Sequence, residues 1–209
     1  PWSLLAMEIY ESSVFFKKAN RLACIGGEVM TNVLVVYKKN FESIHDESLS
    51  QLKFILEEMK SSHQLRVEMR ARERVRRADF IGRDLVIVLG GDGTLTSISH
   101  NIDENTPVMG VNSHPLHSDK DGRVGFYMDS TLNTFADDFL AALNGKAIVN
   151  NLPRLRAIID STSGNRYTTD PAMNELLIAN THQYAPSKYH LRRGEKSTKQ
   201  QSSGVIFST

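Results

Sequence analysis

The segment Asp84–Thr94, with the sequence DLVIVLGGDGT, decides the fold of this chain. Its first six residues are almost entirely aliphatic, which is typical of a strand buried on both faces of a parallel sheet. The strand runs directly into the glycine-rich stretch GGDGT at residues 90–94, and a helical pattern follows over about Leu95–Asn101. A strand, a glycine-rich turn and a helix in this order predict an α/β unit.

The glycine-rich stretch predicts a phosphate site that contains a carboxylate. Glycine has no Cβ, so a ligand can approach its backbone closely, and N–H groups at the start of a helix point toward an anion. A carboxylate repels a phosphate, but it can accept a proton or hold a metal ion beside one. Asp92 is therefore the candidate catalytic residue, and the alternative is an aspartate in an ordinary tight turn.

The neighbouring segments extend the α/β pattern on both sides. Asn32–Tyr37 (NVLVVY) predicts another buried strand, and Glu47–Lys60 has apolar residues at helical spacing, with Asp46 as a candidate N-cap. Seven arginines lie among acidic residues in Arg66–Arg83, where we expect a solvated helix face with internal ion pairs. Leu132–Leu143 predicts an amphipathic helix. Few aromatic residues are interleaved with the arginines, which argues against nucleic-acid binding.

After Pro153 the pattern changes to short strands separated by turns, which predicts an antiparallel β domain. The expected strands are Arg154–Asp160, Met173–Ala179, Lys188–Arg192 and Gly204–Ser208. We expect residues 1–29 to be an N-terminal extension, with Met30 as a candidate natural start. Residues 30–148 would form the α/β domain that carries GGDGT, and residues 149–209 the start of an antiparallel β domain that is incomplete in this chain.

The composition describes a nearly neutral chain with a single cysteine. It has 25 Lys and Arg against 24 Asp and Glu, and Cys24 is its one cysteine. A lone cysteine excludes an intramolecular disulfide and a cysteine-based zinc site, and it favours a reducing compartment. The small net charge argues against a dedicated nucleic-acid or membrane-surface binder, and no apolar run reaches the ~20 residues of a membrane span. We expect a cytoplasmic protein, or a mitochondrial one in a eukaryote.

The GGDGT stretch resembles that of the superfamily that joins NAD kinases, diacylglycerol and sphingosine kinases, and phosphofructokinases. In the lipid kinases an Asn-Glu pair follows this turn directly. Here the pair Asn174-Glu175 stands far downstream inside an apolar segment, as it does in NAD kinases. A buried Asn-Glu pair needs hydrogen-bond partners, and a ligand with hydroxyl groups can provide them.

Two further segments resemble NAD kinases. Gly110–Asn112 and Gly122–Phe126 are similar to the two halves of one family segment, although Ser113–Asp121 separates them here. Gly204–Thr209 is similar to the opening of the family's substrate-binding turn, with Ser203 in place of the usual Asp. In these two departures the chain resembles the divergent branch of the family that includes the mitochondrial-type NAD kinases.

The resemblance implies a fold and an activity. The fold is an α/β N-terminal domain with a GGDGT turn, followed by an all-β antiparallel domain. The activity is transfer of a phosphoryl group from ATP, or from inorganic polyphosphate, to the 2′-hydroxyl of the adenosine ribose of NAD, which makes NADP. Asp92 accepts the proton of that hydroxyl. Mg²⁺ or another divalent cation arrives with the donor, and the protein is a homo-oligomer.

The resemblance also implies roles for individual residues. Backbone N–H groups of Gly91, Gly93 and Thr94 hold phosphate oxygens. The implied NAD contacts are Gly110, Asn112, Phe126, Asn174, Glu175, Ser208 and Thr209. No metal ligand is expected, because His114 and His117, with Asp119 and Asp121, are better explained as parts of a loop.

Two alternative functions remain at this stage. One is a kinase of the same superfamily that acts on a lipid or a sugar alcohol, and the other is a nucleotide-binding module without catalysis. The basic residues near the end of the chain either meet donor phosphates or form a solvated hairpin; they are Lys188, Arg192, Arg193, Lys196 and Lys199.

Overall fold

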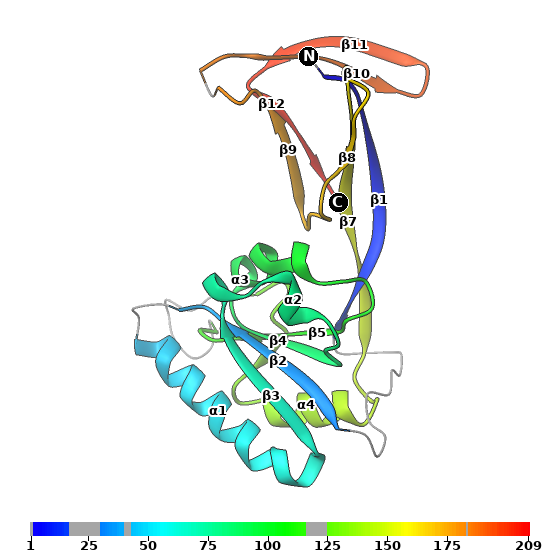
Figure 1. Ribbon diagram of the computed structural model, residues 1–209. Coiled ribbons are helices and arrows are strands. Elements are labelled where there is room, and N and C mark those ends of the chain that lie inside the picture. The colour runs from blue at the N-terminus through cyan, green and yellow to red at the C-terminus, as the bar shows by residue number, and fades with distance from the viewer. Residues whose placement is uncertain (1, 17–29, 40–42, 116–124, 183) are drawn as a thin grey trace. The chain divides into compact units, whose positions relative to one another are not determined.

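The computed structural model of the protein describes residues 2–16, 30–39, 43–115, 125–182 and 184–209. The chain divides into two units: an α/β unit, Glu11–Pro153, and a β unit, which combines Pro1–Tyr10 with Arg154–Thr209. Figure 1 shows the elements of each. The expectations for Cys24, His117, Asp119 and Asp121 concern residues outside the described part of the chain.

A parallel sheet forms the centre of the α/β unit. Its strands, in spatial order, are β3 (Leu65–Ala71), β2 (Thr31–Tyr37), β4 (Leu85–Gly90) and β5 (Val108–Asn112). Two more strands pair with β5 in parallel: β1 (Trp2–Phe16), through Phe15 and Val108, and the short β6 (Ser130–Thr131). The two predicted buried strands are thereby confirmed as β2 and β4.

The register aligns the carboxyl ends of these strands along one edge. Tyr37 of β2 lies opposite Ala71 of β3 on one side and Leu89 of β4 on the other. Gly90 of β4 lies opposite Asn112 of β5. The segments that follow all four strands therefore leave the sheet at the same edge, where open parallel sheets bind their ligands.

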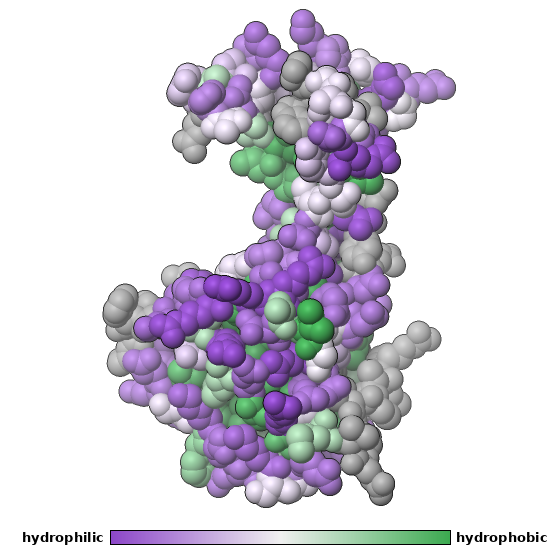
Figure 2. Space-filling model, viewed as in Figure 1, coloured by the Kyte–Doolittle hydropathy of each residue, from purple (hydrophilic) through white to green (hydrophobic). Residues whose placement is uncertain are grey.

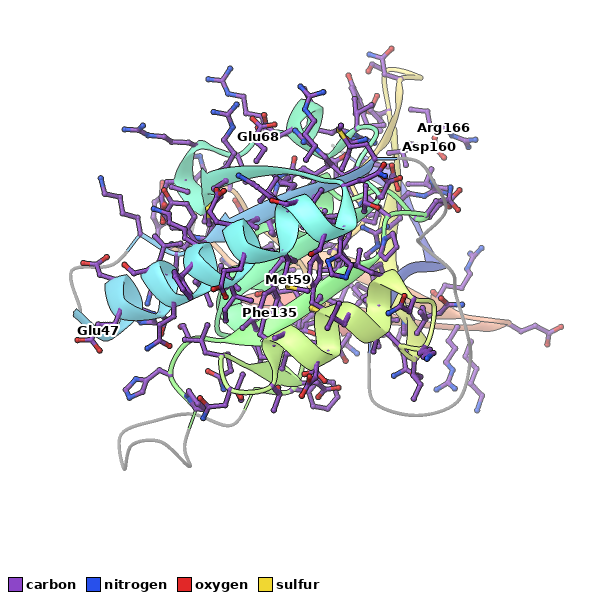
Figure 3. The ribbon with its side chains drawn as sticks, turned by 90° about the horizontal axis from the view of Figure 1, so that it is seen from below. Glu47, Met59, Glu68, Phe135, Asp160 and Arg166 are labelled. Carbon is purple, nitrogen blue, oxygen red and sulfur yellow. The ribbon has the colours of Figure 1, made fainter. Side chains whose placement is uncertain are left out.

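Helices cover both faces of this sheet, because its strands are apolar on both. On one face lie α1 (Ser43–His63) and α4 (Phe135–Leu143), which Figure 3 shows side by side, with Met59 and Phe135 labelled. Both residues belong to the buried core with alternate strand residues such as Val33 and Ile87. On the other face Figure 1 places α2 (Arg77–Phe80) and α3 (Asp92–Ile98). The short 3₁₀ helices are η1 (Arg72–Arg74) and η2 (Ser99–Asn101).

The arginine-rich segment Arg66–Arg83 is not a single helix, so that prediction is wrong. Its first part is β3, in which Leu65, Val67, Met69 and Ala71 alternate with charged residues, and η1 and α2 follow. Alternation is the pattern of a strand, and it places every second side chain against the core. The high density of charge obscured this period of two.

Three predicted helices begin at other residues. The first, α1, begins at Ser43, so Asp46 lies in its first turn instead of capping it. An acidic residue there still interacts favourably with the helix dipole. The helix α3 begins at Asp92, three residues before the predicted start, and α4 begins at Phe135 after a turn.

The β unit is antiparallel, as predicted. It contains β7 (Val149–Ser161, from Arg154 onward), β8 (Arg166–Thr168), β9 (Glu175–Ala179), β10 (Ser187–Arg193), β11 (Lys196–Ser202) and β12 (Gly204–Ser208). The pairs are β7 with β8, β10 with β11, and β9 with β12. The strand β11 was not predicted, because polar residues fill it. The strand β5 was not predicted either. The basic residues near the end of the chain are exposed on the β10–β11 hairpin.

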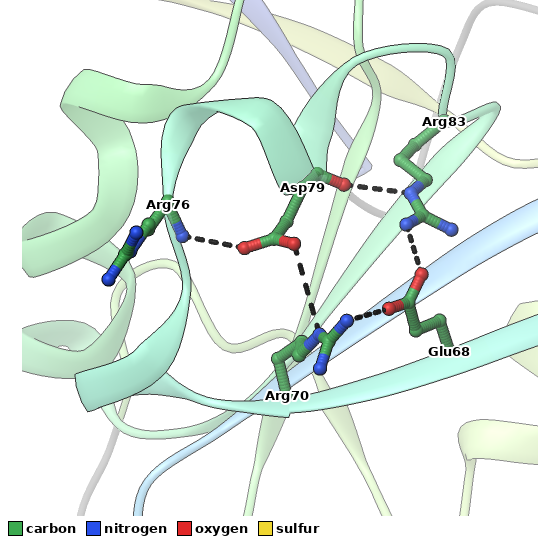
Figure 4. A network of polar contacts seen from close by, with 5 residues as sticks. All are labelled: Glu68, Arg70, Arg76, Asp79 and Arg83. Carbon is green, nitrogen blue, oxygen red and sulfur yellow. Dashed lines mark hydrogen bonds and ion pairs between the residues drawn. The ribbon is translucent and has the colours of Figure 1, made fainter.

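The expected internal ion pairs of the arginine-rich segment are confirmed, and they form one network (Figure 4). Glu68 of β3 pairs with both Arg70 and Arg83, and Asp79 lies 3.8 Å from the Nε of Arg70. The backbone N–H of Arg76 donates to the Asp79 carboxylate at 2.7 Å. The hydrogen bond from Arg83 is the main cause that lowers the pKa of Glu68.

Replacing Glu68 by glutamine should therefore make stability less dependent on pH. At pH 7 we expect the free energy of unfolding to fall by about 0.5–1 kcal/mol, because the carboxylate is one third exposed. A lowered folded pKa stabilises the protein above the ordinary glutamate value of about 4.3, and this stabilisation disappears as the pH falls through the folded pKa. Urea titrations at pH 7 and pH 3 measure the change, with the exposed Glu58→Gln as control. An equal loss at both pH values would contradict the electrostatic explanation.

Candidate active site

Asp92 is the first residue of α3, and its carboxylate is held by the backbone of a distant segment. The N–H of Phe126 donates to Oδ2 at 2.9 Å, and the N–H of Tyr127 donates to Oδ1 at 2.9 Å. Gly91 precedes Asp92 as the N-cap residue of the helix. The carboxylate is therefore fixed at the carboxyl edge of the sheet. The sequence pointed to Asp92, but these two donors were not predicted.

Two glycines near Asp92 are explained by packing within the protein. A Cβ on Gly90 would lie 2.4 Å from the Oγ1 of Thr94, and a Cβ on Gly110 would lie 2.1 Å from the carbonyl oxygen of Tyr127. Contacts this short do not occur between real atoms, so a larger residue at either position would force its neighbours to move. Gly110 is buried within β5. Its role in the structure is to let the backbone of residues 127–128 approach the sheet.

Gly91 and Gly93 differ from these two, because no contact among the described residues explains them. Both are exposed, and no atom of the described part of the chain lies within 4 Å of the place where their Cβ would stand. Neither residue has a positive φ. Gly93 is the second residue of α3, and glycine has a lower helix propensity than alanine. Open space beside an exposed backbone is suited to the close approach of a ligand.

Thr94 is part of the helix itself. Its backbone N–H donates to the carbonyl of Gly91 at 2.8 Å, and its side chain is buried. The N–H already has an acceptor within the protein, which argues against the expected role of Thr94 in holding phosphate. Of the three expected phosphate-binding donors, Gly91 and Gly93 stay predictions.

The end of β5 lies beside the glycine-rich stretch. Asn112 is buried, and its Oδ1 accepts a hydrogen bond from the N–H of His114 at 3.0 Å. The ring of Phe126 is 67% exposed and meets the ring of Tyr127 edge to face at 4.8 Å. The structure thus brings Asp92, Asn112 and Phe126, from three separate segments, to one region of the α/β unit.

A polar contact that was not predicted ties helix α1 to this region. The N–H of the buried Ser113 donates to the carbonyl of Gly90 at 3.1 Å, and its hydroxyl lies 2.7 Å from the Nδ1 of His45. The hydroxyl of Ser48 donates to the Ser113 carbonyl at 2.8 Å. The position of Ser113 just after a buried run was the available signal. No sequence signal points to His45 and Ser48, because their proximity to Ser113 depends on the strand order.

The other expected contact residues meet in the β unit. Ser208 lies opposite Glu175 in the β9–β12 pair, and the N–H of Thr209 donates to the carbonyl of Asn174 at 3.0 Å. The Asn-Glu pair is not buried within a strand, so that expectation is wrong: Asn174 precedes β9, and Glu175 is its exposed first residue. Asn174 has a φ of 72°, a left-handed conformation that asparagine tolerates better than most residues.

The described residues offer no preformed metal site. Within them, no group of three or more His, Cys, Asp and Glu side chains could hold a metal ion. The same part of the chain has no helix with the length and apolar character needed to cross a membrane.

The sequence of this chain is similar to those of known proteins. A sequence model of the ATP-NAD kinase N-terminal domain matches residues 19–145, more than half of the chain. The chain is 30% identical over 120 residues to a probable NADH kinase of Oryza sativa subsp. japonica, an alignment that covers 53% of this chain and 36% of that protein. It is 43% identical over 51 residues to an NADH kinase of Arabidopsis thaliana, covering 24% and 16%.

A bacterial protein is also similar. The chain is 33% identical over 108 residues to an NAD kinase of Laribacter hongkongensis, covering 49% of this chain and 33% of that protein. The alignments thus span about a third or less of the length of these relatives.

Proposed function

Because the chain belongs to the NAD kinase family, we propose that its protein transfers a phosphoryl group from ATP to the 2′-hydroxyl of the adenosine ribose of NAD, producing NADP. The observation that carries this proposal is the pair of exposed glycines, Gly91 and Gly93, on either side of the fixed carboxylate of Asp92. A phosphate can reach the backbone there, and a proton acceptor stands beside it. Two of the similar proteins are named as NADH kinases, which makes NADH an alternative acceptor. Inorganic polyphosphate remains an alternative donor.

Asp92 acts as the general base in this proposal. An alcohol is a weak nucleophile at neutral pH, and a carboxylate within hydrogen-bond distance can accept its proton as the new bond to phosphorus forms. Each oxygen of Asp92 accepts one backbone N–H bond, and each retains a second lone pair for the substrate. The two backbone bonds prevent the carboxylate from rotating, so it is oriented before the substrate binds.

The donor phosphates lie against the backbone of Gly91 and Gly93. Mg²⁺ sites in such enzymes are formed by substrate phosphates and one or two carboxylates. The described residues do not form a cage for the ion. We therefore assign no protein ligand: the divalent cation arrives bound to the donor and neutralises part of its charge.

The acceptor contacts remain proposals. In the α/β unit Phe126 offers an exposed ring for stacking and Asn112 a polar side chain beside the turn. In the β unit the proposed NAD contacts are Asn174, Glu175, Ser208 and Thr209. The buried Gly110 contributes through packing. A homo-oligomer is proposed as well, and light scattering of the purified protein tests it.

The decisive experiment is incubation of the protein with ATP, Mg²⁺ and one acceptor at a time. The acceptors are NAD, NADH, diacylglycerol and fructose 6-phosphate. Formation of NADP from NAD supports the proposal. Phosphorylation of the lipid or the sugar alone would favour another kinase of the superfamily, and ATP binding without any product would indicate a nucleotide-binding module.

Asn174→Ala should weaken NAD binding by about 1–3 kcal/mol, because a hydrogen bond to the ligand is lost. It should also reduce stability, since alanine in a left-handed conformation costs roughly 1–2 kcal/mol. Asn174→Gly separates the two effects: glycine adopts this φ without strain but lacks the amide. Calorimetry with NAD and thermal unfolding measure both. Unchanged NAD affinity in the glycine variant would show that Asn174 is needed only for the left-handed backbone conformation and does not contact NAD.

A further inference from the structure

The carboxyl edge of the parallel sheet continues beyond the glycine-rich stretch, across β2 and β3. The N–H of Lys38, which follows β2, donates to the carbonyl of Leu89 at 3.2 Å. Tyr37 lies opposite both Leu89 and Ala71, so Lys38 stands level with Gly90 on one side and with Arg72 on the other. Neighbouring strands lie ~4.8 Å apart, so Lys38 flanks the glycine-rich stretch and η1 begins ~10 Å from it.

This part of the edge carries cations, and three of the acidic residues near it are already engaged. Glu73 pairs with Arg72 at 2.9 Å, and Asp79 and Glu68 belong to the network of Figure 4. Lys39, Arg74 and Arg76 are exposed, and Lys38 is half-buried. Among the described residues none forms an ion pair with any of these four. Figure 2 shows strongly hydrophilic side chains over the region where Figure 1 places the end of β3 and α2.

We propose that these four residues, the cationic track of Lys38, Lys39, Arg74 and Arg76, bind a linear chain of phosphates that runs from the glycine-rich stretch across β2 and β3. Lysine binds phosphate as a point charge and arginine binds it through two parallel N–H groups. The lysines, beside the turn, would contact the phosphates nearest to the transferred group. The arginines, one strand further, would contact phosphates that a longer chain places there.

The track also gives the site a direction, which rests on the proposed function. The cations lie on the β2 side of Asp92, whereas Asn112 at the end of β5 lies on its other side. Phosphoryl transfer requires the attacking and leaving oxygens to lie on opposite sides of phosphorus, in line. A donor bound along the track and an acceptor bound on the β5 side satisfy this requirement at Asp92.

A phosphate chain can come from ATP or from inorganic polyphosphate, and calorimetry distinguishes the sources. The protein is titrated with ATP, with sodium tripolyphosphate and with long-chain polyphosphate, without NAD, so that no turnover occurs. Two double variants divide the track: Lys38→Gln with Lys39→Gln, and Arg74→Gln with Arg76→Gln. The control, Lys53→Gln with Arg66→Gln, removes the same charge from α1 and from the amino-terminal part of β3.

We expect the lysine variant to weaken binding of all three probes by at least about tenfold, the loss of charge-assisted hydrogen bonds. The arginine variant should weaken the binding of long-chain polyphosphate by about tenfold and the binding of ATP by less than about threefold, because only the long chain reaches Arg74 and Arg76. The control should bind like the wild type. An equal loss of affinity in the control would overturn the proposal. So would wild-type affinity in both track variants, provided that their circular dichroism spectra are unchanged.

Failure of the track and failure of the proposed function have different signatures. If the wild type and the track variants form NADP from ATP and NAD with the same KM for ATP, and also bind long-chain polyphosphate equally well, the kinase stands and the track is wrong. If the phosphate probes bind as expected but no NADP forms, the track stands and the proposed reaction is wrong. If only inorganic polyphosphate depends on the track, that compound is its ligand and ATP is not.

Discussion

Asp92→Asn should lower kcat for NADP formation by about 10²–10⁴-fold while leaving NAD affinity within several-fold of the wild type, as loss of a general base does. The amide cannot accept the proton of the ribose hydroxyl. The carboxylate of Asp92 stands at the start of α3 between two exposed glycines, where the reacting phosphate is proposed to lie. Steady-state kinetics with saturating ATP measure the effect in a preparation that forms NADP.

The structure adds a second consequence of this substitution. The asparagine side chain has one acceptor oxygen, so its NH₂ group would face the N–H of either Phe126 or Tyr127. One of the two backbone bonds must break, and the segment from Gly125 should become more mobile. Hydrogen exchange of the Phe126 and Tyr127 amides follows this directly. Faster exchange at both amides together with weaker NAD binding would show that the residue acts by holding the segment.

Asp137→Asn provides the matched control for Asp92→Asn. It makes the same chemical change at an exposed residue in the first turn of α4, in the same unit. We expect its kcat to equal that of the wild type and its free energy of unfolding to fall by no more than about 1 kcal/mol, the value of a charge at the helix dipole. Turnover like the wild type in Asp92→Asn itself would remove Asp92 from the mechanism.

Gly93→Ala should weaken ATP binding without reducing stability. A Cβ at this position meets no atom of the described residues, and alanine favours a helix over glycine. The free energy of unfolding should therefore stay constant or rise by up to about 1 kcal/mol. The added methyl group would occupy the space where a phosphate approaches the backbone, so we expect ATP affinity to fall by at least about tenfold, the value of a charge-assisted hydrogen bond.

Gly110→Ala is the matched comparison, because its expected effect is the reverse. Its Cβ would lie 2.1 Å from the carbonyl oxygen of Tyr127 and 2.8 Å from the sulfur of Met128. Overpacking of this kind should lower the free energy of unfolding by about 2–3 kcal/mol. Urea denaturation and ATP titration of both variants test the pair. Normal ATP affinity in a stable Gly93→Ala protein would contradict the proposal that a phosphate approaches the backbone at Gly93.

Local sequence determined the features that depend on composition over a few residues. The runs of aliphatic residues in β2 and β4 can be buried only inside a sheet, so both strands were predictable within one residue of their bounds. The same holds for the glycine-rich stretch that contains Asp92. Short strands separated by turn residues predicted the antiparallel arrangement after Pro153. In each case the hydrophobic effect and turn geometry act on neighbours along the chain.

Only the tertiary structure decided what depends on strand order and register. Asp92 meets the N–H groups of Phe126 and Tyr127 because the segment before β6 passes the start of α3. Lys38 stands beside Gly90 because β2 is the neighbour of β4. The left-handed backbone of Asn174 is likewise set where β9 and β12 pair. Such contacts join residues far apart in sequence, so no local pattern records them, and their geometry exists only once the strands have paired.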